Sequence, residues 1–321
     1  MVTQPIVAPL DVPALQHNRV IETALSDYWA LTKPEVNLLI VITTFAGFYL
    51  GRAASWRDFP FLLMLHTLVG TLLVASGAGT LNQYIERRFD AQMRRTARRP
   101  LADGRLKPSA VLWFGLALSL IGSVYLSVAV NLLASLLAVL TLLSYLFLYT
   151  PLKRKTPLCT LAGAFPGAMP PLIGWAGASG KVGFEAWVLY ALLFLWQFPH
   201  FMAIAWMYRD DYDRAGYLVL PPEGPARDRF VNFQTLWPLS GLVALSPLLA
   251  SGGQPFSLCG IGVFLLNLGF FCCGAQFVVR RTNAAARWLL TASIINLLSL
   301  FIWMVFLRAG GLTGTVVSNP W

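Results

Sequence analysis

Oxygen-bearing side chains recur every four residues in one stretch that directly follows a long apolar run. These side chains belong to Asn82, Glu86 and Asp90. In an α-helix, each step of four residues turns the side chain by about 40° and advances it by about 6 Å, so the three share one face. Amide and carboxylate oxygens suit a hard cation such as Mg²⁺, which is usually held by one or two carboxylates together with substrate phosphates. The spacing therefore predicts a magnesium site on this helix face.

Six arginines accompany the oxygen-bearing residues in the same polar segment. A guanidinium group matches the geometry of phosphate oxygens, so acids followed by arginines indicate a site for a metal ion and phosphates. The alternative is a solvated helix end whose arginines only mark the cytoplasmic side of a membrane. The period of four and the order of acids before bases favour the phosphate site. The arginines are Arg87, Arg88, Arg94, Arg95, Arg98 and Arg99.

A second acidic segment, which contains Asp210 and Asp211, follows a later apolar run. The two aspartates are candidates for a second half of the Mg²⁺ site, and the alternative is a solvated acidic turn. The two acidic segments recur at an offset of four apolar runs, and so do Lys33-Pro34 before the first run and Lys155-Thr156-Pro157 before the fifth. An even offset keeps the orientation, so a parallel repeat would make both acidic segments face one central cavity.

Four further polar residues stand out near the ends or inside apolar runs. Lys153 and Arg154 lie at the same predicted rim as the acids, where they would contact a diphosphate or only fix the topology. His200 lies inside an apolar run directly after Pro199, and an ionisable residue at membrane depth is a functional candidate. A neutral imidazole can bind haem iron or donate to a substrate, whereas a structural histidine would only stabilise the kink. We interpret His66 as a structural or pore-facing residue.

The composition identifies the class of protein. Of 321 residues, 57% are hydrophobic and 12% are charged, whereas soluble domains average about 25% charged residues. The chain is therefore expected to be an all-α polytopic membrane protein, because backbone groups in lipid must be satisfied within helices. The net charge of +10 does not indicate nucleic-acid binding, because the basic residues lie in short loops between apolar runs.

Nine apolar runs approach the roughly 20 residues that a membrane-spanning helix needs. We expect nine transmembrane helices around a central cavity, formed by residues 31–308, with tails at 1–30 and 309–321. The run that contains residues 163–171 is interrupted by glycines and prolines. The expected spans are 34–52, 60–85, 109–128, 131–150, 157–177, 185–207, 232–250, 256–279 and 286–308.

Lysines and arginines are distributed unequally between alternate loops, which predicts the orientation. A cytoplasmic N-terminus places nearly all of them inside and leaves the C-terminus outside. Since residues 1–30 lack the features of a signal or transit peptide, we expect a bacterial inner membrane with the active site toward the cytoplasmic face. The few outer basic residues are Arg52, Arg57, Lys181 and Arg308.

Several motifs together resemble the protohaem IX farnesyltransferase (haem O synthase) family, within the intramembrane aromatic prenyltransferase (UbiA-like) superfamily. The resemblance covers roughly residues 28–308. The motifs are Leu31-Thr32-Lys33-Pro34, Asn82-x-x-x-Glu86-Arg-x-x-Asp90 with its arginines up to Pro100-Leu101, Tyr149-Thr150-Pro151-Leu152-Lys153-Arg154, and Trp196-Gln197-x-Pro199-His200-Phe201 followed by Asp211-Tyr212-x-x-Ala215-Gly216.

The resemblance implies a Mg²⁺-dependent transfer of the farnesyl group of farnesyl diphosphate to a vinyl group of protohaem IX (haem B), with addition of water, giving haem O and diphosphate. It implies that Asn82, Glu86 and Asp90 are catalytic and bind Mg²⁺, that Asp210 and Asp211 bind metal, and that His200 binds haem. Its implied partners are the lipid bilayer and, as a candidate, a haem A synthase. The implied diphosphate-binding residues are Arg94, Arg95, Arg98, Arg99, Lys153 and Arg154.

Two other functions stay open at this point. Related enzymes that act on phenolic quinone precursors usually show Asp-x-x-x-Asp at both sites. Here Glu86 takes the place of the first acid, and the residue four after Asp211 is Ala215. A transporter would place its ionisable groups through the middle of the membrane, whereas these groups are concentrated at the predicted inner rim.

Overall fold

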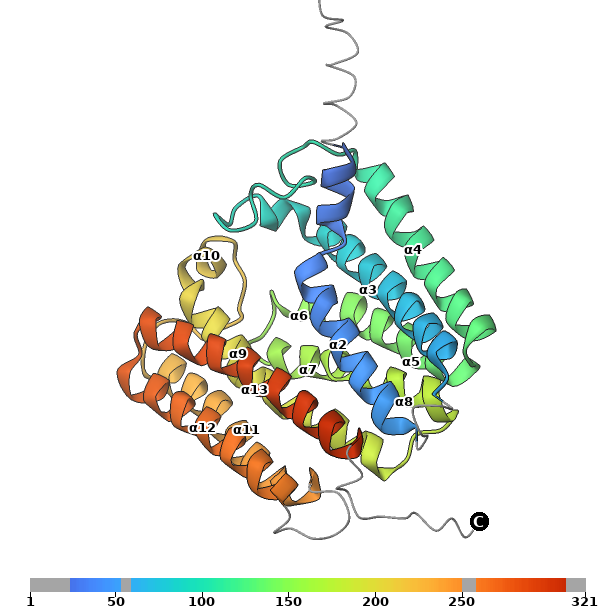
Figure 1. Cartoon of the computed structure of the whole chain (residues 1–321). Coiled ribbons are helices and arrows are strands. Elements are labelled where there is room, and N and C mark those ends of the chain that lie inside the picture. Colours follow the sequence, from blue (N-terminus) through green and yellow to red (C-terminus); the bar gives the residue numbers. More distant parts are fainter. Residues whose placement is uncertain (1–23, 53–58, 250–257, 310–321) are drawn as a thin grey trace, which may run out of the picture.

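The computed structural model describes residues 24–52, 59–249 and 258–309, and every regular element in those ranges is helical. The predicted all-α class is therefore confirmed. Figure 1 shows the helices packed side by side in one assembly. The elements are α2 (Pro34–Gly51), α3 (Phe61–Asp90), α4 (Pro108–Ala129), α5 (Leu132–Leu143), the π-helix η2 (Ser144–Tyr149), α6 (Thr150–Leu152), α7 (Cys159–Gly167), α8 (Met169–Ser179), α9 (Phe184–Met207), α10 (Arg209–Arg214), α11 (Pro225–Leu249), α12 (Leu258–Arg280) and α13 (Asn283–Ala309).

Seven helices in the described ranges are long and apolar enough to cross a membrane, which makes the chain a multi-pass membrane protein. The predicted span 131–150 is the continuous run from α5 through η2 to α6. Residues 232–249 of the predicted span 232–250 lie within α11, which starts earlier, at Pro225, with a charged first turn, and residue 250 lies outside the described residues. The seven helices are Pro34–Gly51, Phe61–Asp90, Pro108–Ala129, Leu132–Leu152, Phe184–Met207, Gly260–Arg280 and Asn283–Phe306.

The predicted span 157–177 is divided into two shorter helices, as its glycines and prolines indicated. α7 ends at Gly167 and α8 begins at Met169. Pro170 lies in the first turn of α8, where a missing N–H costs little. Beside the break, Gln197 Nε2 of α9 donates over 2.8 Å to Ala164 O, which also accepts from the backbone N–H of Ala168.

Close packing of α2 against α8 depends on two glycines. A Cβ atom added to Gly47 would lie 2.1 Å from the Pro171 carbonyl oxygen, and one added to Gly174 would lie 2.0 Å from the Thr44 carbonyl oxygen. Small residues allow helix backbones to approach closely in a membrane, where helices associate through packing contacts.

The polar segments meet at one end of the helical assembly. α3 continues to Asp90, five residues beyond the predicted span, so all three oxygen-bearing residues belong to one unbroken helix. The segment between α3 and α4 and the short helix α10 lie at the same end in Figure 1. Arg57 and most of both predicted tails lie outside the described residues.

Candidate active site

The oxygen face of α3, formed by Asn82, Glu86 and Asp90, is almost completely buried. The three residues are 1%, 6% and 1% exposed. Burial of carboxylates is unfavourable unless they are paired or bind a metal ion. The face therefore needs positive partners, and the structure shows which residues supply them.

Each of the three side chains contacts a cation from a different segment of the chain. The cations come from the residue before α2, the residue after α6 and the loop after α3. In this arrangement the protein's own charges satisfy the oxygen face. The N–O distances are 2.8 Å for Lys33–Asn82, 2.9 Å for Lys153–Glu86 and 2.7 Å for Arg99–Asp90.

One oxygen of the face keeps no partner. Asp90 Oδ1 is buried and makes no hydrogen bond within the described part of the chain. A buried carboxylate oxygen without a donor is unusual and fits a cation ligand. No group of three or more His, Cys, Asp or Glu side chains gathers among the described residues. A Mg²⁺ ion here would therefore depend on the amide of Asn82, the two carboxylates and substrate phosphates.

Lys33 is a site residue to which the sequence motif assigned no role. It adopts a left-handed backbone conformation, with φ of 55°, directly before Pro34. Burial, together with the positive charges of Arg99 and Lys153, lowers the pKa of Lys33 to about 7. Among the described residues, the amine forms no ion pair with a carboxylate, and the one hydrogen bond that it donates goes to the neutral amide of Asn82. It is therefore a candidate donor to an anionic ligand.

Lys153 has the opposite electrostatic environment. Burial would lower the pKa of its amine, but the adjacent Glu86 carboxylate outweighs this effect and raises the pKa well above its ordinary value. The amine contacts both oxygens of Glu86, at 2.9 and 3.1 Å, and lies 4.6 Å from the ring centre of Tyr149. Lys153 therefore carries a fixed positive charge at the oxygen face.

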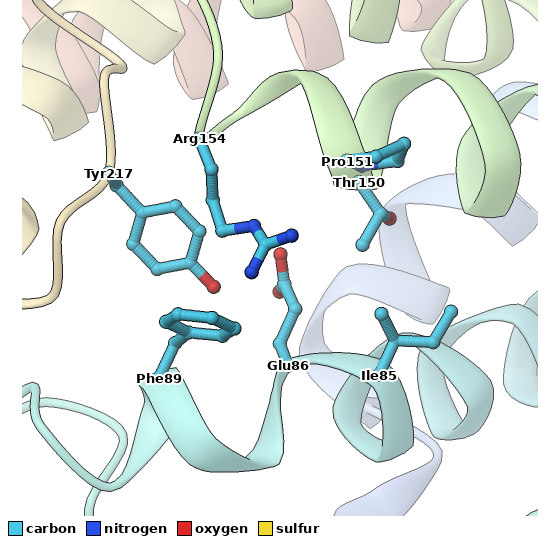
Figure 2. A pocket seen from close by; sticks show the side chains of 7 residues that line it. All are labelled: Ile85, Glu86, Phe89, Thr150, Pro151, Arg154 and Tyr217. Atoms are coloured by element: carbon cyan, nitrogen blue, oxygen red, sulfur yellow. The ribbon is translucent and has the colours of Figure 1, made fainter.

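A cavity of about 90 Å³ opens beside Glu86. Figure 2 shows the side chains of Glu86, Arg154 and Tyr217 pointing toward one another. The Tyr217 hydroxyl is buried and has no hydrogen-bond partner in the described chain, and burial raises its pKa. The Arg154 guanidinium lies 4.6 Å from the ring centre of Phe89. The cavity is lined by Ile85, Glu86, Phe89, Thr150, Pro151, Arg154 and Tyr217.

The two predicted aspartates of the second segment differ sharply. Asp211 is 9% exposed, and its Oδ2 accepts from the backbone N–H of Arg95 over 3.3 Å. Its other oxygen accepts from Arg214 over 3.1 Å. The side chain of Asp210 is 82% exposed and lies 3.7 Å from Arg209. The structure therefore brings Asp211, but not Asp210, into contact with the first segment.

The remaining predicted diphosphate-binding arginines fall into two groups. Arg95 lies over the rings of Tyr208 and Tyr212, at 4.6 and 5.5 Å, and donates to the Tyr212 hydroxyl over 3.1 Å. It thereby ties the loop after α3 to α10. The side chains of Arg94 and Arg98 are exposed, and no described residue forms an ion pair or hydrogen bond with them. These two lie in the loop without contacting the oxygen face.

His200 lies on α9 and contacts none of the oxygen-face residues. Its Nδ1 is 2.7 Å from Ser293 Oγ of α13, and its ring stacks on Trp196 with centres 4.7 Å apart. His66 lies near the start of α3, and its Nδ1 is 2.6 Å from the Tyr125 hydroxyl of α4. This contact fits the structural interpretation of His66.

Comparisons with known proteins agree with this geometry. The sequence model of the UbiA prenyltransferase family matches residues 40–305. A protein of Solibacter usitatus named "Protoheme IX farnesyltransferase" is 44% identical over 89% of this chain and 100% of its own length. A protein of the same name from Koribacter versatilis is 39% identical over 96% and 98%.

Solved structures show the same fold. A UbiA homolog from Archaeoglobus fulgidus, bound to DMAPP and Mg²⁺, superimposes with a TM-score of 0.69 over 88% of this chain and 99% of its own, at 15% identity. A digeranylgeranylglyceryl phosphate synthase superimposes with a TM-score of 0.68 over 89% and 99%, at 19% identity.

Proposed function

This chain belongs to the UbiA prenyltransferase family, and we propose that it transfers the farnesyl group of farnesyl diphosphate to a vinyl group of protohaem IX, giving haem O. One observation carries the proposal: the buried oxygen face of α3, with a cation at each of its three side chains, lies in a chain 44% identical to a protein named "Protoheme IX farnesyltransferase". The oxygen face supports the binding of the diphosphate, and the names of the relatives indicate protohaem IX as the acceptor substrate.

The diphosphate half is supported by the charges around α3. Asn82, Glu86 and Asp90 would hold Mg²⁺, which when bound neutralises negative charge on the departing diphosphate. Lys33, Lys153 and Arg99 now donate to these same oxygens, at 2.8, 2.9 and 2.7 Å. With the oxygens engaged by an ion, the three cations become donors for diphosphate oxygens. Arg154 and the unpartnered Tyr217 hydroxyl add two donors at the cavity. The proposed diphosphate-binding set has three outer members in the loop after α3, which are Arg94, Arg95 and Arg98.

The acceptor half needs no nucleophilic side chain. The bond between the farnesyl C1 and oxygen breaks, and its electron pair leaves with the diphosphate. A vinyl carbon of the haem then bonds to C1, water adds to the resulting cation, and a proton is released. An allylic cation is stabilised by aromatic faces in a site shielded from water, and Phe89 and Tyr217 supply such faces at the cavity. His200 would bind the haem.

The second acidic segment would complete the metal site mainly through Asp211. Its carboxylate is buried and contacts the loop of the first segment, whereas Asp210 points its carboxylate toward solvent. Asp210 as a metal ligand stays a prediction, and the geometry gives it less support. The number of Mg²⁺ ions in the site would depend on whether Asp211 binds one directly.

We also propose the arrangement in the membrane. Nine helical segments would cross it, with the N-terminus in the cytoplasm, the C-terminus outside and the oxygen face at the cytoplasmic side of a bacterial inner membrane. The concentration of lysines and arginines in alternate loops supports this orientation. Farnesyl diphosphate would enter from the bilayer, and a haem A synthase would take up the haem O.

The test is to identify the product. Membranes that contain the protein are incubated with Mg²⁺, radiolabelled farnesyl diphosphate and haem B. The haems are then separated by chromatography and identified by mass spectrometry. We expect label in haem O, and none from membranes without the protein. Parallel incubations replace haem by 4-hydroxybenzoate. Label in a prenylated phenol, with none in haem, would refute the proposal and favour a quinone-precursor enzyme.

A further inference from the structure

The hydroxyl of Ser293 has two short contacts that together determine the proton position on His200. Ser293 Oγ lies 2.6 Å from the Leu290 carbonyl oxygen and 2.7 Å from His200 Nδ1. A carbonyl oxygen can only accept, and a serine hydroxyl has a single hydrogen to donate. That hydrogen must therefore point to Leu290, which leaves the oxygen of Ser293 as an acceptor. Nδ1 of His200 must then carry a proton.

The protonation of Nδ1 determines the chemistry of the other ring nitrogen. In a neutral imidazole, one nitrogen donates and the other keeps a free lone pair. Membrane depth disfavours a charged ring, so Nε2 of His200 is left as the basic nitrogen. Nε2 has no partner among the described residues, and the side chain is only partly buried. A basic nitrogen without a protein partner is available to a ligand.

The ring is also held in place by its surroundings. Trp196 stacks on it at 4.7 Å with an angle of 26° between the planes. The same indole donates its Nε1–H to the Ser293 carbonyl oxygen over 2.7 Å, which joins α9 to α13. Trp196 is 4% exposed and Ser293 is fully buried. The orientation of the imidazole is therefore fixed by two elements at once.

We propose that Ser293 is a positioning residue that keeps His200 in the Nδ1–H form, so that Nε2 can bind the iron of the haem substrate. This deepens the proposed function and rests on it. Histidines that bind metals commonly donate their second N–H to a protein oxygen, which fixes the tautomer and orients the ring. The Ser293 hydroxyl takes the role of that oxygen here. Neither residue contacts the oxygen face, so haem placement and diphosphate binding should be separable.

The first experiment measures the tautomer without haem. The chain has 3 histidines, so ¹⁵N-histidine labelling in bilayers gives few signals, and His200→Gln identifies those of His200 by their loss. We expect a protonated Nδ1 and an unprotonated Nε2 in the wild-type protein. Ser293→Ala should give a mixture of tautomers, and Ser293→Thr, which keeps the hydroxyl, should restore the wild-type pattern.

The second experiment titrates haem B into purified protein and follows its absorption spectrum. Ser293→Ala should weaken haem binding about 10-fold, the lower end of the range for residues that orient metal-binding histidines. His200→Gln should remove the spectral shift, and Ser293→Thr should restore affinity. Ser246→Ala is the matched control, because Ser246 is also buried and donates to a backbone carbonyl, on α11. It should bind haem as the wild type does.

Two results would overturn the inference: an unprotonated Nδ1 in the wild-type protein, or wild-type haem affinity and spectrum in a folded Ser293→Ala protein. If Ser293→Ala does not fold, the wild-type nitrogen signals decide alone: a protonated Nδ1 supports the inference, and an unprotonated Nδ1 overturns it. A protein that passes both tests but forms no haem O would instead refute farnesyl transfer to haem, and leave the histidine site intact.

Discussion

The two acidic segments of this protein differ in how their carboxylates are arranged. On α3, the oxygens recur every four residues along a continuous helix, and all three side chains are buried beside cations. On α10, two aspartates are adjacent, and only Asp211 is buried. Adjacent residues on a helix point in directions about 100° apart, so Asp210 cannot share the direction of its neighbour. Spacing decides which acids can act together.

The comparison also separates two roles. The α3 segment presents an unpartnered oxygen, Asp90 Oδ1, and three cations. Both oxygens of Asp211 already accept hydrogen bonds, one from the loop after α3 and one from Arg214. We infer that the first segment binds the ligand and that the second mainly holds the first segment in place. The following predictions test that division.

The largest effect is expected at the unpartnered oxygen. Asp90→Asn keeps the size of the side chain but removes its charge, so turnover should fall by about 100-fold or more, as for the loss of a group that stabilises transition-state charge. Haem O formation at saturating Mg²⁺ measures it. Asp103→Asn is the control, because Asp103 lies in the loop after α3, half exposed and paired with Arg105. Equal activity of the two variants would contradict the assignment.

A smaller loss is expected at the cavity. Tyr217→Phe removes only the buried hydroxyl without a partner, and a hydrogen bond to a charged group contributes about 1.5–3 kcal/mol. The affinity for farnesyl S-thiolodiphosphate should fall about 10-fold, as measured by calorimetry. Tyr212→Phe removes a hydroxyl that already accepts from Arg95 in an exposed contact, and should change the affinity by less than about 2-fold. Unchanged binding by Tyr217→Phe would remove this residue from the site.

The smallest effects distinguish the two adjacent aspartates of α10, Asp210 and Asp211. Asp211→Asn should lower turnover about 5-fold, the equivalent of about 1 kcal/mol, because its hydrogen bonds to the loop weaken. Asp210→Asn should leave turnover within about 2-fold of the wild type, because its carboxylate is solvated. Steady-state kinetics of both variants measures this. A greater loss in Asp210→Asn than in Asp211→Asn would show that α10 rearranges to bind metal.

The features that could be predicted from the sequence depend on local spacing. The period of four predicted the common face of Asn82, Glu86 and Asp90, and the apolar runs predicted the all-helical class. The glycines and prolines of residues 163–171 predicted the interruption, which the structure shows as the break between α7 and α8. Each of these follows from helix geometry and backbone chemistry within a few residues.

The features that could not be predicted depend on contacts between distant segments. Lys33 is 49 residues from Asn82, and Lys153 is 67 residues from Glu86. The spacing of residues along the sequence does not indicate which cation contacts which oxygen. Tyr217 follows a turn after α10, and only the packed structure shows that its hydroxyl is buried at the cavity. The motif Leu31–Pro34 was the one sequence signal for Lys33, and it gave no role to the lysine.

The central claim is that the oxygen face of α3 holds Mg²⁺ together with a diphosphate. The most direct measurement is the affinity of purified protein for farnesyl S-thiolodiphosphate, by calorimetry, across a series of Mg²⁺ concentrations. We predict that the wild-type protein binds at least about 10-fold more tightly at saturating Mg²⁺ than without it, because ion and diphosphate bind together. Asp90→Asn should lose most of that dependence while remaining folded. The same dependence on Mg²⁺ in both proteins would contradict the account.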